Sequence, residues 1–290
     1  MTFHSSELQM NAPVALAEVL ELYAQKASKW KLFAGGTDLM VELHAGHCHQ
    51  HQFLSLHRVR ELRGIHVDEQ FVTIGATSTY RDIVNNEVIA NEFPNLHQAA
   101  RWTGAVAIQS RGTLGGNIGN ASPAADSPPA LISYNSEIEL ASVRGRRWVR
   151  YSDFHTGYKT TCAASDEIIT RVRIPRRKEK FVHFYKKVGP RKALAISKLS
   201  LAAAVRLENK VVCEVSLGFA SLAPTVLKPV SIENDLLGVH LSVDSIKQLR
   251  EKFQQTLRPI TDVRSTAEYR ATVAANLFEE FLKSLLSCCE

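Results

Sequence analysis

The chain has 290 residues, of which 45% are hydrophobic and 22% are charged, and its formal net charge is +6. This is the balance of a globular protein long enough for one to three domains. No run approaches the 18 apolar residues of a membrane helix, and the N-terminus lacks the basic and apolar pattern of a signal peptide. Five cysteines in no framework spacing favour a reducing compartment, so we expect a cytoplasmic protein.

The first 57 residues predict a small α/β unit. An amphipathic helix places Leu16, Val19, Leu20 and Tyr23 on one face. After this helix we expect a strand at 30–34, a glycine loop at 35–38, a helical stretch and a strand at 53–56. Strand, loop, helix and strand in this order indicate a parallel arrangement.

The rest of the chain predicts a mixed part followed by an antiparallel sheet with helices. Residues 80–104 read as two helices that are separated at Pro94. We expect strands at 71–77, 137–142, 146–154, 167–175 and 181–189, a hairpin around 208–210, and helices at 243–257 and 265–286. The last helix is expected to place Tyr269, Val273, Leu277 and Leu282 on a roughly common stripe. We therefore predict an α+β fold with domains at 1–57, 58–176 and 177–290.

Two glycine-rich loops are the most informative features. One, "AGGTD", follows a strand and precedes a helix, so its amides and the helix N-terminus can face a phosphate. The other, "TLGGNIGN", brings Asn117 and Asn120 beside a second bare backbone. Asp126 is the only acidic residue between Arg111 and Glu137, and its carboxylate suits sugar hydroxyls. The loops suit a ligand with a pyrophosphate, polyol chains and flat rings.

These stretches resemble the FAD-binding subunit of the molybdenum hydroxylases, the group of xanthine dehydrogenase and carbon monoxide dehydrogenase. The resemblance lies in "KLFAGGTDL" (31–39), "GTLGGNIGNASPAADSPPAL" (112–131), "EIITRVRIP" (167–175), "FYKKVGPRKALAISKLSLAAAV" (184–205) and "DVRSTAEYR" (262–270), in that order. It is strongest to the bacterial xanthine dehydrogenase type. It implies the FAD-binding fold of the molybdopterin dehydrogenase (PCMH) type, with an α/β N-terminal part, a mixed middle domain and a C-terminal antiparallel sheet with helices.

The resemblance also implies roles for particular residues. The loops would wrap the pyrophosphate and ribityl regions, Asp126 would bind cofactor hydroxyls, and Ile169 would pack on a ring. Lys186, or its neighbour Lys187, would lie near the flavin and stabilise negative charge on it. The implied FAD-binding residues are Phe33, Ala34, Gly35, Gly36, Thr37, Asp38, Leu39, Thr113, Gly115, Gly116, Asn117, Asn120, Asp126, Ile169 and Lys186.

The resemblance implies an oxidoreductase that works as part of a complex. A large molybdopterin subunit would oxidise the substrate, a small [2Fe–2S] subunit would relay electrons, and FAD in this chain would pass them to NAD⁺ or another acceptor. The complex could be a dimer of such heterotrimers. No cysteine set for an iron–sulfur centre is present in the sequence. We expect no catalytic side chain and no metal ligand in this chain.

Several alternatives stay open. The chain could be a free-standing FAD reductase of the same cofactor fold, or a non-enzymatic nucleotide-binding scaffold. The basic stretches 143–150 and 175–180 could guard a sheet edge or meet a partner, and Arg144–Arg150 is a candidate contact surface. Without a zinc-finger or RNA-recognition signature, nucleic acid is the weaker interpretation and we expect none. Four histidines and Cys48 in 43–52 could bind zinc or copper, although a solvated loop is the simpler interpretation.

Overall fold

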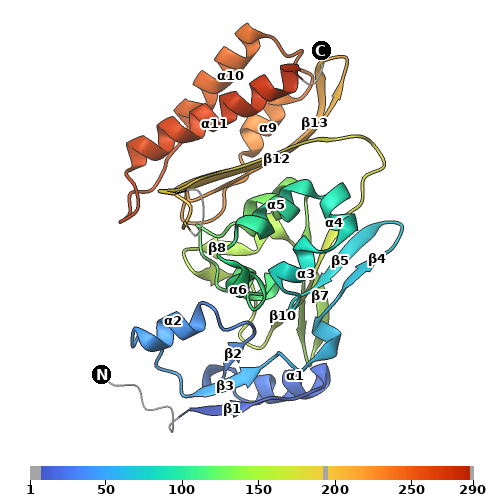
Figure 1. Cartoon of the computed structure of the whole chain (residues 1–290), viewed down its shortest axis with the longest axis vertical. Helices are drawn as coiled ribbons and strands as arrows, with labels where there is room; N and C mark the ends of the chain where they lie inside the picture. The colour runs from blue at the N-terminus through green and yellow to red at the C-terminus, as the bar shows by residue number, and fades with distance from the viewer. Residues whose placement is uncertain (1–7, 192–194, 288–290) are drawn as a thin grey trace.

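The computed structural model describes residues 8–191 and 195–287, and it has an α+β fold with three successive sheets (Figure 1). The first sheet has the order β1-β3-β2, and both pairings are parallel. Its elements are β1 (Gln9–Asn11), α1 (Leu16–Gln25), β2 (Lys31–Phe33), α2 (Leu39–His44) and β3 (Gln52–Ser55). The parallel unit predicted from the sequence is therefore confirmed. The strand β1 was not predicted, because it is short and its side chains are largely exposed.

The middle sheet is antiparallel, with the order β4-β5-β10-β6-β7. Its strands are β4 (Ile65–Val67), β5 (Phe71–Gly75), β6 (Glu137–Ser142), β7 (Gly145–Arg150) and β10 (Ile168–Pro175). Six helices accompany it: α3 (Tyr80–Val84), α4 (Glu87–Glu92), α5 (Pro94–Trp102), α6 (Val106–Gln109), α7 (Leu114–Gly119) and α8 (Ser127–Ser133). A short ribbon of β8 (His155–Gly157) and β9 (Thr160–Thr161) completes this part.

Local capping explains where the helices of the middle part differ from the prediction. A break at Pro94 is confirmed, since this proline occupies the first turn of α5. A second break lies before α4, where the Asn86 side chain accepts a hydrogen bond from the N–H of Ile89 at 3.0 Å. The strand expected at 146–154 ends at Arg150, because Tyr151 turns into the core in a 3₁₀ helix.

The C-terminal sheet is antiparallel, with the order β11-β12-β13. Its elements are β11 (Val182–Val188), β12 (Leu199–Glu208), β13 (Val211–Ala220), α9 (Val230–Leu236), α10 (Val243–Thr256) and α11 (Ala267–Ser287). The predicted hairpin is confirmed: Asn209 and Lys210 both have positive φ, as a two-residue β-hairpin turn requires. On the predicted stripe of α11, Leu277 and Leu282 are buried, whereas Tyr269 is 41% exposed.

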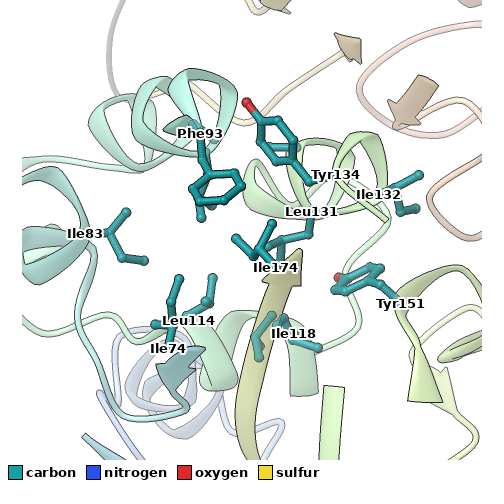
Figure 2. Close-up of a cluster of buried hydrophobic side chains, with 14 of the residues drawn as sticks. Ile74, Ile83, Phe93, Leu114, Ile118, Leu131, Ile132, Tyr134, Tyr151 and Ile174 are labelled. Carbon is teal, nitrogen blue, oxygen red and sulfur yellow. The ribbon is translucent and has the colours of Figure 1, made fainter. Parts of the chain in front are cut away.

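A buried apolar core fills the middle part, where helices α3 to α8 meet the sheet (Figure 2). Figure 2 shows Ile74 and Ile174 of the sheet beside Leu114, Ile118 and Leu131 of the helices. Alanines of the C-terminal sheet belong to the same core, namely Ala202, Ala204 and Ala220. Each sheet takes its strands from one of the ranges 1–57, 58–176 and 177–290, and the division into these domains stays a prediction.

A glycine lets α8 approach the C-terminal sheet closely. A Cβ atom at Gly218 of β13 would lie 2.4 Å from the carbonyl oxygen of Pro129 in α8. This contact is with backbone, which cannot rotate away as a side chain can. The sheet and the helix therefore depend on a residue without a side chain at this position.

Replacing Gly218 by alanine should lower the free energy of unfolding by about 1–3 kcal/mol, because α8 must move away from the sheet. Denaturant unfolding would measure the loss. Glu214→Ala, at an exposed position of the same strand, is the control and should change stability by less than about 1 kcal/mol. Equal stabilities of G218A and the wild type would contradict the packing argument.

Candidate cofactor-binding site

The two glycine loops predicted from the sequence lie against each other. A Cβ atom at Gly35 would lie 2.0 Å from the carbonyl oxygen of Arg111, so the two backbones are in direct contact. A Cβ atom at Gly116 would lie 3.8 Å from the Cβ of Ala34, which joins the loops at a second point. The structure therefore brings together residues that belong to separate parts of the sequence.

The first loop presents backbone amides that have no internal partner. Gly36 has a φ of +73°, which favours glycine, and a side chain there would strike the ring of Phe33. Among the residues that the structure describes, none accepts a hydrogen bond from the backbone N–H groups of 35–38. Leu39 anchors the loop through its buried side chain, whereas Asp38 is exposed. Converging free amides of this kind can bind an anion.

The second loop forms a helix, α7, that was not predicted from its glycines. The Thr113 hydroxyl caps this helix by accepting a hydrogen bond from the N–H of Gly116 at 3.1 Å. Burial of Leu114 and Ile118 offsets the low helix propensity of glycine. A Cβ atom at Gly115 would lie 2.5 Å from that of Ala76, so this glycine serves packing, whereas Gly116 is exposed.

Three further predicted residues lie in α7 or next to it. The Asn117 side chain accepts a hydrogen bond from the hydroxyl of Ser127 at 2.7 Å, so its oxygen is already used inside the protein. Asn120 forms the C-terminal cap of α7 and is half-buried. Ile169 lies on β10, and its Cδ1 atom would be 3.6 Å from a Cβ atom at Gly119. Ile169 is half-buried against the exposed edge of the second loop.

A nearly buried ion pair links Asp126 to the C-terminal sheet. The Lys187 Nζ atom lies 2.7 Å from Oδ2 of Asp126, and the two side chains are 8% and 11% exposed. The other carboxylate oxygen, Oδ1, is buried and has no hydrogen-bond partner. Burial raises the pKa of Asp126 to about 6, although the charge of Lys187 and its hydrogen bond lower it. An unpartnered buried acceptor of this kind fits a ligand hydroxyl.

The structure distinguishes the two lysines that the sequence could not separate. Neighbouring side chains on a strand point to opposite faces. Lys186 lies on the face of β11 that packs against α11, where it pairs with Glu280 of that helix at 2.5 Å and is about half exposed. Lys187 is the lysine that reaches Asp126. The contact with Asp126 favours Lys187, the stated alternative, and which of the two lysines lies near FAD stays a prediction.

Two aromatic residues of this cluster were not singled out as ligand contacts. The Tyr185 hydroxyl donates a hydrogen bond to the backbone carbonyl of Asp126 at 3.0 Å. The Lys187 ammonium group donates one to the carbonyl of Trp102 at 3.3 Å, and the rings of Trp102 and Tyr185 are 5.7 Å apart. Strand alternation would have placed Tyr185 on the same face as Lys187. The contact with Trp102 had no sequence signal.

The other sequence candidates have structural explanations. Cys48 packs in a small core with Leu39, Leu43 and Phe53, and no group of three metal-ligating side chains occurs among the described residues. The basic stretch on edge strand β7 is largely neutralised: Arg144 pairs with Asp166 and Arg147 with Glu167, both at 2.7 Å. Cys288 and Cys289 lie outside the described residues.

Comparison with known proteins identifies the family. Residues 6–177 match the family described as the FAD binding domain in molybdopterin dehydrogenase, and residues 183–285 match the CO dehydrogenase flavoprotein C-terminal domain. The chain belongs to the FAD-binding medium subunits of the molybdenum hydroxylases. The resemblance seen in the sequence is thereby confirmed. None of the described helices is long and apolar enough to cross a membrane.

Individual relatives in this family align over nearly the whole chain. The xanthine dehydrogenase FAD-binding subunit of Escherichia coli O157:H7 is 30% identical, over 94% of this chain and 92% of its own. The glyceraldehyde dehydrogenase medium chain of Sulfolobus acidocaldarius is 29% identical, over 87% of this chain and 89% of its own. A solved carbon monoxide dehydrogenase of Hydrogenophaga pseudoflava superposes with a TM-score of 0.92 at 25% identity, covering 98% of each chain. The predicted fold class is therefore confirmed.

The backbone and side-chain groups of the site fit FAD. The free amides of 35–38 suit a pyrophosphate, and the unpartnered oxygen of Asp126 suits a hydroxyl. The exposed backbone at Gly116 leaves room for a ligand to approach. The assignment of individual residues to FAD stays a prediction.

Replacing Lys187 by methionine should lower the free energy of unfolding by about 3 kcal/mol at pH 8, because a buried carboxylate loses its partner. The raised pKa of Asp126 means that its contribution to stability is fully present below pH 3.8 and is lost as the pH rises through about 6. The loss in K187M should therefore be smaller at pH 5, where Asp126 is mostly protonated. Urea unfolding at both pH values measures this difference.

Lys186→Met is the matched control, because it removes the same charge from a half-exposed side chain of β11. Its effect should be below about 1 kcal/mol and nearly equal at both pH values. Equal losses in K186M and K187M, or a K187M loss that does not change with pH, would contradict the assignment of the buried pair.

Proposed function

We propose that this chain is the FAD-containing electron-transfer subunit of a molybdenum hydroxylase. It takes electrons from the [2Fe–2S] clusters of a small partner subunit and passes them to NAD⁺ or another acceptor. A large molybdopterin subunit of the same complex oxidises the substrate, and the complex is a dimer of heterotrimers. The observation that carries the proposal is the buried, half-satisfied Asp126 beside two touching glycine loops, in a chain of this family.

The need for partners follows from what the chain contains. Iron–sulfur clusters require sets of cysteine thiolates, and the five cysteines here are scattered or lie at the tail. Relatives along the whole chain are named as medium chains or FAD subunits, including those of carbon monoxide dehydrogenase and nicotinate dehydrogenase. These names support a chain that works beside other subunits.

The residues of the site would bind and orient the cofactor. FAD supplies the redox chemistry when it is bound, by accepting electrons and passing them on. The free amides of residues 35–38 would hold its pyrophosphate, and Oδ1 of Asp126 would accept a hydrogen bond from one of its hydroxyls. Lys187 uses one N–H for Asp126 and one for the Trp102 carbonyl, so a third N–H remains for the ligand.

Size-exclusion chromatography of the native extract, followed by metal and flavin analysis, tests the assembly. The chain should elute with two further subunits and with molybdenum, iron and FAD. A chain that elutes alone, yellow, and that oxidises NAD(P)H with a small substrate would be the free-standing reductase instead. A colourless chain that elutes alone would be the scaffold.

Replacing Gly116 by leucine should remove FAD, because Gly116 is exposed and a side chain there would fill the path by which the ligand approaches the second loop. A Cβ atom at Gly116 would also lie 2.7 Å from the Thr113 hydroxyl that caps α7, so the unfolding midpoint of the variant is measured as well. The absorbance of the purified protein and its flavin content after denaturation measure the loss. Ser152→Leu, at an exposed position outside the loops, should keep stoichiometric FAD. Full FAD occupancy in G116L would show that the second loop does not hold the cofactor.

Replacing Asp126 by alanine should weaken FAD binding by about 1–3 kcal/mol, which corresponds to roughly 5- to 150-fold in the dissociation constant. Asp126→Asn keeps one acceptor oxygen and should lose less. Isothermal titration of the apoprotein with FAD measures both variants. An unchanged dissociation constant in D126A would remove Asp126 from the site.

A further inference from the structure

A hydrogen-bond chain of three side chains lies behind the second glycine loop and ends at Asn117. The buried Ser127 hydroxyl donates a hydrogen bond to Oδ1 of Asn117 at 2.7 Å. The Tyr80 hydroxyl lies 3.2 Å from the same Ser127 oxygen, and Tyr80 is buried as well. A serine hydroxyl carries one proton, so Tyr80 is the donor to Ser127. The hydrogen-bond chain therefore runs from Tyr80 through Ser127 to Asn117.

The surrounding backbone holds Tyr80 in place. Tyr80 begins α3, where the Thr79 cap forms a capping box with Asp82. The backbone N–H of Tyr80 donates a hydrogen bond to the carbonyl of Gly112 at 3.1 Å, at the start of the second loop. Burial raises the pKa of the Tyr80 hydroxyl well above its usual range. Tyr80 therefore keeps its proton near neutral pH and remains a donor.

The direction of the hydrogen-bond chain decides which end of the Asn117 amide is free. Because Ser127 engages Oδ1, the free end is Nδ2, which carries two N–H donors. None of the described residues accepts a hydrogen bond from Nδ2. Asn117 is half-buried and follows the exposed Gly116. Two unpaired donors at the margin of the site fit an acceptor of the ligand.

The place of Asn117 in the site favours an anionic acceptor. The neighbouring Gly116 lies near Ala34 of the first loop, and the backbone N–H groups at 35–38 also have no acceptor among the described residues. Donors of both loops therefore lie close to the point where the loops touch, and a pyrophosphate offers several charged oxygens to them. Asp126, which precedes Ser127, presents the opposite chemistry through its unpartnered Oδ1.

We propose that Ser127 and Tyr80 are positioning residues, which hold Asn117 with its amide N–H groups toward the pyrophosphate of the cofactor. This inference rests on the proposed function, because it requires FAD in the site. Both positioning residues are buried and act through Asn117. Without the Ser127 hydroxyl, the Asn117 amide can turn over and present its oxygen to the phosphate, and these two acceptors repel each other.

Titration of the apoprotein with FAD tests the positioning role. Ser127→Ala should weaken binding about fivefold, and Tyr80→Phe, which keeps the ring, about threefold. Ser133→Ala is the matched control, because Ser133 is a buried serine of the same helix whose hydroxyl donates to the Ala130 carbonyl at 2.8 Å. S133A should bind FAD as the wild type does. The unfolding midpoint of each variant shows whether the fold is intact.

A double-mutant cycle separates positioning from general damage to the fold. Asn117→Ala should weaken FAD binding at least about tenfold, because the free donors are lost. The double variant N117A/S127A should bind no more weakly than N117A, since Ser127 acts only through Asn117. Asn117→Asp still accepts the Ser127 hydrogen bond but replaces the N–H groups by a charged oxygen, so it should bind FAD at least about tenfold more weakly than N117A.

The possible results separate the positioning role from the proposed function. Wild-type affinity in S127A, an equal loss in S133A, or additive losses in N117A/S127A overturn the positioning role and leave the proposed function standing. An N117D variant that binds as the wild type does overturns the orientation of Asn117, and this variant carries the test if S127A does not fold. Wild-type affinity in Y80F removes Tyr80 from the hydrogen-bond chain. A wild-type chain that binds no FAD overturns the proposed function itself, and the positioning role with it.

Discussion

The ion pair between Asp126 and Lys187 is the constraint on which the candidate site depends. It joins the start of α8 in the middle part to β11 of the C-terminal sheet, and both side chains are nearly buried. Desolvating two charges is costly, and further hydrogen bonds from Tyr185 to the Asp126 carbonyl and from Lys187 to the Trp102 carbonyl help to hold the pair. Because only one oxygen of Asp126 is engaged, the other remains available to a ligand.

Glycines allow the parts of the molecule to approach one another. Gly35 lies on the backbone of Arg111, Gly115 on Ala76, and Gly218 on Pro129, each closer than any side chain would permit. Two of these contacts assemble the glycine loops, and the third brings α8 onto the C-terminal sheet that carries Lys187. These three glycines therefore serve close packing. Gly116, by contrast, is exposed and can face a ligand.

The distribution of ion pairs shows how little the net charge says about a surface. The densest basic stretch, on β7, is matched by the carboxylates of Asp166 and Glu167 and guards a sheet edge. An exposed side chain acts on a partner only when no carboxylate of its own chain engages it, and only the folded structure shows which cations meet this condition.

The elements with strong local signals, and the family, can be predicted from the amino-acid sequence alone. The alternation in 137–142 and 167–175 gave β6 and β10, Pro94 gave the start of α5, and the loop motifs gave the resemblance that the comparisons confirmed. These features depend on side-chain periodicity and on backbone conformations that few residues adopt, so they can be read locally. Short or glycine-rich elements such as β1 and α7 were not predicted, because strand pairing and side-chain burial stabilise them and intrinsic propensity does not.

The set of residues that meet at the site depends on how distant elements pack in the folded chain. Lys186 and Lys187 have the same chemistry. A shift of one residue along β11 moves a side chain from the face that packs against α11 to the face that contacts Asp126. The oxygen of Asn117 is taken by Ser127, and Trp102 contributes a backbone carbonyl that no sequence pattern indicates. Such contacts join residues far apart in the chain, so they are fixed by packing between elements and not by the residues next to them in sequence.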